Sequence, residues 1–289
     1  MAPTNSKVIL ITGASSGLGL AAARRLHAAG HRVYGGSRSL AASEGFAGIV
    51  LDVDDDGSVA RGVEAILSRE GRIDAVVNNA GIGYAGSIED LTMEEARQQL
   101  ETNFFGALRV CRAVLPVMRG QGAGLLVNVT SIGAQIALPY QGHWTASKLA
   151  LEGMSQALRG EVGRFGVRVV VIAPGDFCTG FTAHRVRGSR AGSPSPYAAR
   201  FVNALEVVER DERAGLKPVR FAMLLERIVS GPRPRPRYVV GPAFERLALA
   251  LKGLLHASWF ESGVRWYYRV GWRRGARRGP WMPARIMRE

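Results

Sequence analysis

The sequence KVILITGASSGLG at residues 7–19 decides the fold class. It opens with a short aliphatic run typical of a buried strand and passes directly into a turn that contains Gly13, Gly17 and Gly19. A helical pattern follows and ends at Gly30. A strand, a glycine turn and a helix in this order bring free backbone N–H groups and the positive end of a helix dipole together, where a pyrophosphate can bind.

Similar units repeat along the chain, because short apolar runs alternate with helical stretches. This alternation implies right-handed crossovers and a parallel sheet that helices cover on both faces. We therefore predict an α/β fold, a doubly wound parallel sheet of seven strands in a single domain spanning residues 1–241. The expected strands are residues 7–12, 32–37, 48–51, 74–78, 125–130, 167–173 and 237–241. The expected helices include residues 58–69, 93–118, 144–165, 197–213 and 217–230.

Parallel sheets of this type bind ligands at the carboxyl ends of their strands. Several strands are followed there by polar or small residues: Asp52-Val53, residues 78–81, Ser131 and Pro174-Gly175. The sequence therefore predicts one ligand site along this edge of the sheet.

The second expected strand ends at Arg38. An acidic residue at this distance from the glycines would bind the ribose 2′-hydroxyl of NAD, but no acid appears before Glu44. A guanidinium suits a 2′-phosphate through its charge and its fork of donors. We predict NADP(H) rather than NAD(H); a solvated surface arginine is the alternative, and it leaves the missing acid unexplained.

Together these motifs resemble the short-chain dehydrogenase/reductase family of Rossmann-type oxidoreductases, over about residues 7–241. The matching pieces are TGASSGLG at residues 12–19, Asp52-Val53, NNAG at residues 78–81, Asn103, Ser131, Lys148, Pro174-Gly175 and Thr179. The later part of the chain looks more loosely like the 17β-hydroxysteroid-dehydrogenase-like branch, which acts on bulky lipophilic alcohols and ketones. The expected activity is hydride transfer between NADP(H) and a lipophilic ketone or alcohol.

The resemblance implies a role for each matching position. Ser131 would bind the substrate oxygen, Lys148 the nicotinamide ribose, and Asn103 a water at the end of a proton relay. The implied catalytic positions are Asn103, Ser131, Trp144 and Lys148. The implied cofactor-binding residues are Gly13, Ser15, Ser16, Gly17, Leu18, Gly19, Arg38, Asp52, Val53, Asn79, Ala80, Gly81, Lys148, Pro174, Gly175 and Thr179. The expected substrate pocket includes Tyr140, His143 and Trp144.

Trp144 departs from the family motif Tyr-x-x-x-Lys. A phenol has a pKa of about 10 that a nearby ammonium can lower, whereas an indole N–H donates a hydrogen bond but does not titrate usefully. Loss of a general acid costs about 10²–10⁴-fold in rate. Tyr140, or a water held by Lys148, Ser131 and Asn103, could replace it.

Three explanations of Trp144 stay open. It is a substitution engineered into a competent enzyme, it serves a substrate such as an iminium or activated alkene that needs no acid there, or the protein binds NADP(H) without turnover. The last alternative describes a catalytically silent sensor or scaffold.

Residues 176–230 are expected to form a lid over the pocket. Within them, Tyr197, Phe201, Leu205 and Val208 recur at helical spacing and would face a hydrophobic substrate. Ordinary core packing of this helix is the alternative.

The expected tail, residues 242–289, is basic and aromatic. The whole chain has 38 Lys and Arg against 24 Asp and Glu, and thirteen of these cations, against three Glu, follow residue 230. Leu247, Leu251 and Leu254 share one helical face with Phe244. Tryptophans and arginines interleave further on, at Trp259, Arg265, Trp266, Arg269, Trp272, Arg273, Arg274, Arg277, Arg278, Trp281, Arg285 and Arg288. This composition favours either an anionic membrane surface or packing on the domain or a partner; nucleic acid is disfavoured because no recognition motif is present.

The remaining composition sets wider limits. At 289 residues and 47% hydrophobic, the chain can bury a large core, and its apolar runs are shorter than the roughly 20 residues of a membrane-spanning helix. Cys111 and Cys178 favour reduced thiols over a disulfide or metal site. We expect a cytoplasmic protein, peripheral to a membrane if the tail binds one. Pairing of family members through the helices at 93–118 and 144–165 implies a homo-oligomer.

Overall fold

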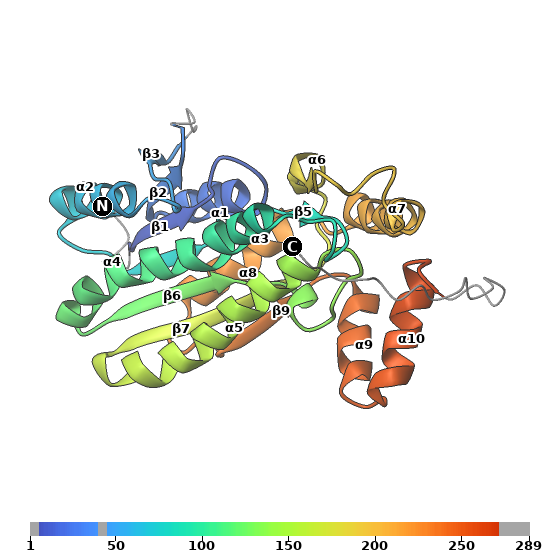
Figure 1. Cartoon of the computed structure of the whole chain (residues 1–289). Coiled ribbons are helices and arrows are strands. Elements are labelled where there is room, and N and C mark those ends of the chain that lie inside the picture. The colour runs from blue at the N-terminus through green and yellow to red at the C-terminus, as the bar shows by residue number, and fades with distance from the viewer. Residues whose placement is uncertain (1–5, 40–44, 272–289) are drawn as a thin grey trace, which may run out of the picture.

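The computed structural model describes residues 6–39 and 45–271 and contains one large parallel sheet (Figure 1). Its strand order is β3-β2-β1-β4-β6-β7-β9, so the predicted doubly wound sheet of seven parallel strands is confirmed. The strands are β1 Val8–Thr12, β2 Arg32–Ser37, β3 Ala47–Val50, β4 Ala75–Asn78, β6 Gly124–Val129, β7 Val167–Pro174 and β9 Arg237–Val240. A short parallel pair, β5 Tyr84–Ala85 and β8 Val186–Arg187, lies outside this sheet.

Alternate residues of β1 enter two different cores, which explains why the whole strand is apolar. Val8 and Leu10 pack with residues of α2 (Asp56–Glu70), α4 (Gly106–Gln121) and α5 (Gly142–Val162). Ile9 and Ile11 pack with α1 (Gly17–Ala28) and α8 (Val219–Ser230). Helices therefore cover both faces of the sheet and leave its strand ends open.

The expected helix at residues 93–118 contains a break. It consists of α3 (Met93–Leu100), one π-helical turn η1 (Glu101–Phe105) and α4. Asn103 lies in the π-helical turn and is buried. The extra residue of such a turn bends the helix and redirects its side chains, frequently at functional sites.

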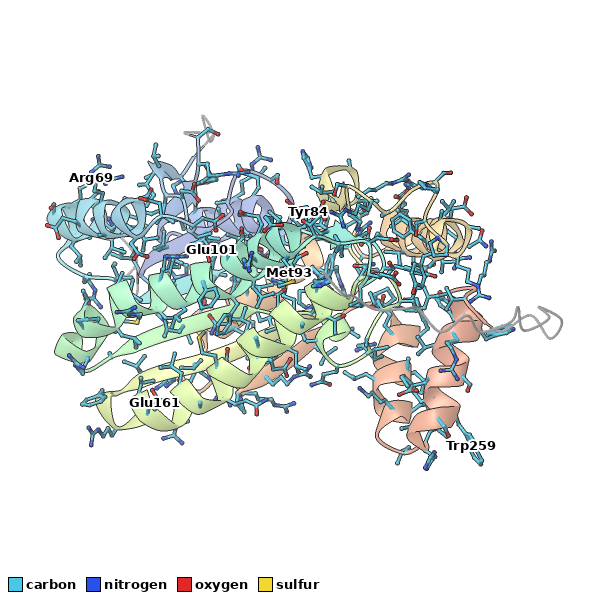
Figure 2. The ribbon with its side chains drawn as sticks, viewed as in Figure 1. Arg69, Tyr84, Met93, Glu101, Glu161 and Trp259 are labelled. Carbon is cyan, nitrogen blue, oxygen red and sulfur yellow. The ribbon has the colours of Figure 1, made fainter. Side chains whose placement is uncertain are left out.

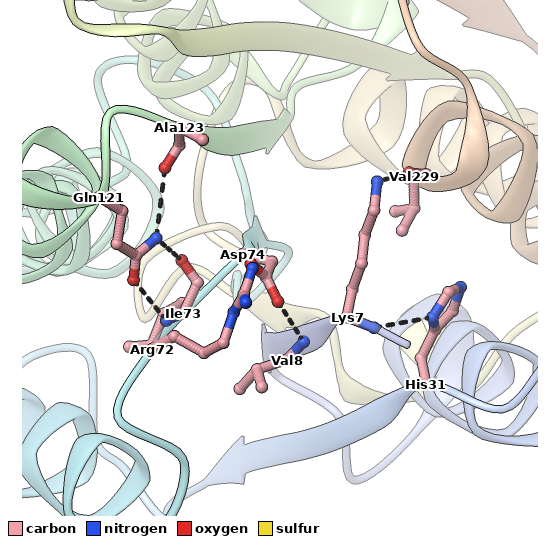
Figure 3. A network of polar contacts seen from close by, with 9 residues as sticks. All are labelled: Lys7, Val8, His31, Arg72, Ile73, Asp74, Gln121, Ala123 and Val229. Carbon is pink, nitrogen blue, oxygen red and sulfur yellow. Dashed lines mark hydrogen bonds and ion pairs between the residues drawn. The ribbon is translucent and has the colours of Figure 1, made fainter. Parts of the chain in front are cut away.

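At the amino ends of β1 and β4 a polar network ties the elements together (Figure 3). Asp74 accepts a hydrogen bond from the Val8 amide at 2.8 Å and another from Arg72 at 2.9 Å. Gln121 accepts from the amide of Ile73 at 3.0 Å and donates to its carbonyl at 2.9 Å. This edge of the sheet is fastened by its own side chains, whereas the opposite edge carries the predicted ligand residues.

The segment expected to form a lid contains α6 (Phe181–His184) and α7 (Ala198–Ala214). Phe201 and Leu205 of α7 form a separate small core with Ala85 and Ala191, against which Tyr140 packs. The apolar face of α7 is thus occupied by ordinary core packing, the alternative left open above.

The tail begins with two helices, α9 (Ala243–Lys252) and α10 (Ala257–Tyr267), which lie side by side as a hairpin that projects from the sheet (Figure 1). Neither helix has a fully buried residue. The predictions for Trp272, Trp281 and the arginines from Arg273 to Arg288 fall outside the described residues. Within those residues, no helix has both the length and the apolar character that a bilayer crossing requires.

Candidate active site

The glycine turn connects β1 to α1 and packs tightly against Asn79 and Ala80, which follow β4, and so forms a cradle at the strand ends. Gly13 and Gly17 have φ values of 65° and 55°, in the left-handed region that favours glycine. A Cβ on Gly19 would overlap the Gly13 carbonyl oxygen and approach Asn79 Nδ2 to 2.6 Å. Asn79 fastens the turn by donating from Nδ2 to the carbonyls of Thr12 (3.0 Å) and Gly13 (3.1 Å).

The first turn of α1 lies at this cradle with its amides open. Its N-cap residue, Ser16, makes no side-chain capping hydrogen bond. The orphan N–H groups and the helix dipole are suited to a phosphate. The residues present therefore fit the pyrophosphate of a dinucleotide.

Residues that would meet the adenosine end follow β2 and β3. Arg38 is exposed at the end of β2 and lines the same cavity as the glycine turn, together with Asp52 and Val53. Asp52 is locally ordered, since its amide donates to Ser58 Oγ (2.9 Å) and its carboxylate accepts from the Asp54 amide (3.1 Å).

Ser131 and Lys148 both line the cavity near the end of β6. The Ser131 hydroxyl donates to the Pro174 carbonyl at 3.2 Å and accepts from the Gly133 amide at 2.9 Å. Lys148 is buried, and its Nζ donates to the Val129 carbonyl at 3.1 Å. Burial lowers the pKa of Lys148 to about 8.

Asn103 holds the loop after β4, which borders this site. Its Nδ2 donates to Ser147 Oγ (3.0 Å) and to the Ile82 carbonyl (3.1 Å), and its Oδ1 accepts from the Ile82 amide (2.9 Å). Asn103 does not itself line the cavity, whereas Gly81 and Ile82 do. In this geometry Asn103 positions the loop after β4. That it also holds a water of a proton relay remains a prediction.

Trp144, in the first turn of α5, lines the cavity with Ser131 and Lys148. Its ring lies against Gly133, where an added Cβ would overlap Cζ3 of the indole. No hydrogen bond of the indole N–H occurs within the described part of the chain. Glycine at position 133 therefore makes room for the large ring, and the indole keeps one donor available to a ligand.

Two of the expected pocket residues lie elsewhere. Tyr140 and His143 are not in the cavity wall. The Tyr140 ring packs edge-on against Phe201, with centroids 5.7 Å apart, and its backbone has a φ of 64°. The Tyr140 ring thus belongs to the small core under α7 and does not enter the cavity.

The remaining predicted residues come together along the carboxyl edge of the sheet. All the predicted cofactor residues except Gly19 line the cavity, and Gly19 is buried beneath it. The cavity has a volume of about 1140 Å³. Across residues 6–39 and 45–271, no group of His, Cys, Asp and Glu side chains is arranged to hold a metal ion.

The cavity wall also contains a pair of carboxyl groups that the sequence does not indicate. The Asp176 amide donates to both carboxylate oxygens of Glu245 at 3.2 Å, and the two side chains share a hydrogen bond. Burial, and then the hydrogen bond with Glu245, raise the pKa of Asp176 well above its usual range. Pro174-Gly175 marks the position of Asp176, but nothing in the sequence indicates a partner on α9.

The second unforeseen feature is that the tail hairpin forms much of the cavity wall. Its contribution is largely apolar and consists of Phe244, Ala248, Leu251, Leu255, Trp259, Phe260, Gly263, Val264, Tyr267 and Tyr268. The wall that we expected from α7 is thus supplied mainly by α9 and α10, and α7 adds only Glu212. Helical spacing in the tail indicated an apolar face but not what that face contacts.

The chain matches known proteins over most of its length. Residues 7–189 match the family model described as short chain dehydrogenase. A 3-ketodihydrosphingosine reductase of Bacteroides thetaiotaomicron is 41% identical over 265 residues, which cover 91% of this chain and 98% of that protein.

Two crystal structures share the architecture. A short-chain dehydrogenase from Streptomyces avermitilis has a TM-score of 0.76 and 29% identity, over 92% of this chain and 98% of its own. A 3-ketoacyl-(acyl-carrier-protein) reductase from Brucella melitensis, complexed with NADH, has a TM-score of 0.70 and 25% identity, over 84% of this chain and all of its own. The matched family model, the cradle for a dinucleotide and the Ser131–Lys148 arrangement agree, and this chain belongs to the short-chain dehydrogenase/reductase family of NAD(P)-dependent oxidoreductases.

Proposed function

We propose that this protein reduces the keto group of a long-chain lipid with NADPH as the cofactor. The observation that carries the proposal is the continuity of the cavity, which runs from the glycine turn past Ser131 and Lys148 to the apolar wall on α9 and α10. The similarity to a 3-ketodihydrosphingosine reductase along nearly its whole length supports a ketone with a long alkyl chain. The looser resemblance to the 17β-hydroxysteroid-dehydrogenase-like branch supports the same class of bulky lipophilic substrate.

Arg38 is the reason for preferring NADPH to NADH. It lines the cavity at the end of β2, where its guanidinium can pair with a 2′-phosphate. When bound, the cofactor supplies the hydride. The glycine turn would hold its pyrophosphate, and Lys148 and Thr179 lie in the cavity wall where the nicotinamide end would be held.

The proton that completes reduction needs a source other than residue 144. The Ser131 hydroxyl and the Trp144 N–H can both donate hydrogen bonds to the substrate oxygen. Lys148 is the nearby group that titrates close to neutral pH, since burial lowers its pKa to about 8. In this proposal the Lys148 ammonium gives a proton to the developing alkoxide, directly or through one water, and the neutral amine is reprotonated from solvent.

A catalytically silent NADP(H)-binding protein is the second candidate, and Trp144 is the observation that favours it. The indole fills the position of the family's titrating phenol and packs closely on Gly133. If Lys148 cannot reach the substrate oxygen, the cavity binds the cofactor and a lipid without turnover.

Single-turnover experiments separate the two candidates. NADPH-loaded protein is mixed with long-chain 3-ketones of increasing chain length, with a short water-soluble ketone, and with an iminium and an enone. We expect oxidation of NADPH by the ketones, with an apparent affinity that rises with chain length and a rate that falls above a pH of about 8 as Lys148 loses its proton. Tight NADPH binding without oxidation by any of these compounds would instead establish the silent candidate. Oxidation only by the iminium or the enone would indicate a substrate that needs no acid at position 144.

A further inference from the structure

Exposed apolar side chains are concentrated on the α9–α10 hairpin. Leu254 and Trp259 are 82% and 73% exposed, and Trp266 is 80% exposed. Phe244, Leu247, Leu251 and Leu255 are exposed as well. Large exposed apolar patches mark surfaces that bind something.

The tip of the hairpin lies farthest from the sheet. Leu254 and Leu255 belong to the connection between the two helices, and Trp259 follows in the first turn of α10. Figure 2 shows Trp259 at the outer end of the hairpin, away from the body of the protein. An element that only closed the core would direct these side chains inward.

The same surface forms the rim of the cavity. Leu251, Leu255 and Trp259 are exposed to solvent and also line the cavity that reaches Ser131. The outer apolar patch and the inner apolar wall are therefore continuous. A lipid that lies against the outside of the hairpin can therefore enter the cavity along these apolar side chains.

Charge and length suit a lipid surface. Four cations, Arg246, Lys252, Arg265 and Arg269, accompany the apolar residues, against the exposed Glu261 and the half-buried Glu245. Trp and Leu with interleaved cations are typical of helices that lie in the interface of an anionic membrane. The eleven residues of α10 are about 16 Å long, roughly half of a bilayer's hydrocarbon thickness, so the hairpin can enter one leaflet but cannot cross.

We infer that the α9–α10 hairpin docks on an anionic membrane, with Leu254, Leu255 and Trp259 inserted among the lipids, and takes a lipid substrate directly from the bilayer into the cavity. This inference rests on the proposed function for the nature of the substrate, whereas the docking itself does not require turnover. Docking places the mouth of the cavity at the lipid surface. The alkyl chain can then enter the cavity without being exposed to water, which is unfavourable for an apolar chain.

A second copy of the chain is the competing occupant of this patch. A symmetric contact would place two hairpins with a net positive charge against each other, which costs energy. It would also close the route along Leu251 and Leu255 into the cavity. Both arguments favour a lipid surface.

Vesicle flotation of the full chain tests the docking. The probes are phosphatidylcholine vesicles with and without phosphatidylglycerol, and the variant is Leu254→Glu/Trp259→Glu, whose high exposure allows folding. The control is Val202→Glu/Val219→Glu, which introduces the same two glutamates at residues that are 46% and 47% exposed on α7 and α8. We expect the wild type and the control to float with the anionic vesicles, and the double variant to bind about a hundredfold more weakly because two apolar side chains no longer leave water.

A second measurement links docking to substrate delivery. For this measurement the variant is Leu254→Glu alone, because Leu254 is 82% exposed and does not line the cavity. It should raise the apparent KM for a ketone held in vesicles and leave that for a short water-soluble ketone unchanged. Equal flotation of wild type and double variant, or no flotation of either, overturns the inference. It is also overturned if the double variant changes only the oligomeric state, measured by light scattering, which would identify the patch as a contact between copies. Flotation measures binding to vesicles and requires no catalysis. The docking can therefore be tested even if the proposed function is wrong.

Discussion

The two halves of the cavity are built on different principles. The cofactor half consists of strand ends and a glycine turn whose main-chain carbonyls, at Thr12 and Gly13, accept hydrogen bonds from the Asn79 side chain. The substrate half is formed largely by two helices without a fully buried residue, attached through contacts that include the Asp176–Glu245 pair and the hydrogen bond from the Tyr267 hydroxyl to Asp211. The first half has little freedom to change, because almost any side chain added at Gly19 overlaps backbone. The second half can change its lining while the sheet stays intact, which suits the part of an oxidoreductase that determines its substrate.

The sharpest test of this contrast is Trp144→Tyr. If the cofactor half is competent and lacks only its acid, a phenol beside Lys148 should raise the single-turnover rate with a long-chain ketone by about 10²–10⁴-fold. Trp144→Phe serves as the control, because it removes the indole without adding a titrating group. A rate for the Tyr variant equal to that of the Phe variant contradicts the assignment of position 144 to the reacting oxygen.

Gly19→Ala tests whether the glycine turn binds the cofactor. The added methyl group overlaps the Gly13 carbonyl and crowds Asn79, so we expect NADPH affinity to fall by about a hundredfold or more. The matched control is Gly153→Ala, on α5, where nothing lies within 4 Å of the new Cβ and stability should be unchanged or slightly higher. Calorimetric titration of NADPH checks both; unchanged affinity in Gly19→Ala means that the turn does not hold the cofactor.

Arg38→Ala examines the nucleotide preference. Loss of a charge-assisted contact to a 2′-phosphate should weaken NADPH binding by about 10–100-fold and leave NADH binding almost unchanged. Arg24→Ala, at an exposed arginine of α1 that does not line the cavity, is the control. Equal losses for NADPH and NADH would remove the basis for choosing NADPH.

We expect the smallest effect at the Asp176–Glu245 pair, which helps to attach the hairpin and makes stability depend on pH. Because the folded-state pKa of Asp176 is raised, its contribution to stability is complete at pH values below the usual carboxyl range and is lost as pH rises through the raised value. The melting temperature of the wild type should therefore fall by a few degrees between neutral and alkaline pH. Asp176→Asn/Glu245→Gln, which keeps the hydrogen-bonding shape without the shared proton, should show a flatter profile; parallel profiles would exclude a protonated pair.

The residues that line the cofactor half could be located from the sequence because their determinants are local. A run such as residues 7–19 contains the strand, the turn and the helix together, and the alternation of such units predicts a parallel sheet covered by helices on both faces. Asn103 could be located in a helix, but the π-helical turn that directs it toward Ser147 and Ile82 has no pattern in the sequence.

The substrate half could not be predicted because it depends on pairs distant in the chain. Glu245 meets Asp176 across 69 residues, and Tyr140 follows the aromatic core of α7 instead of entering the pocket. Periodicity showed that the tail has an apolar face, yet the same pattern fits a core, a membrane or a cavity wall. Only the three-dimensional arrangement shows that α9 and α10 border the cavity.

The most direct measurement of hydride transfer follows an isotope from cofactor to lipid. NADPH deuterated at the transferable position of the nicotinamide is incubated with the protein and a long-chain 3-ketone, and the extracted alcohol is analysed by mass spectrometry. We predict one deuterium on the carbinol carbon of the product, formed faster by Trp144→Tyr. Unlabelled ketone recovered in full from protein that binds NADPH tightly would contradict the account and establish a binding protein in place of a reductase.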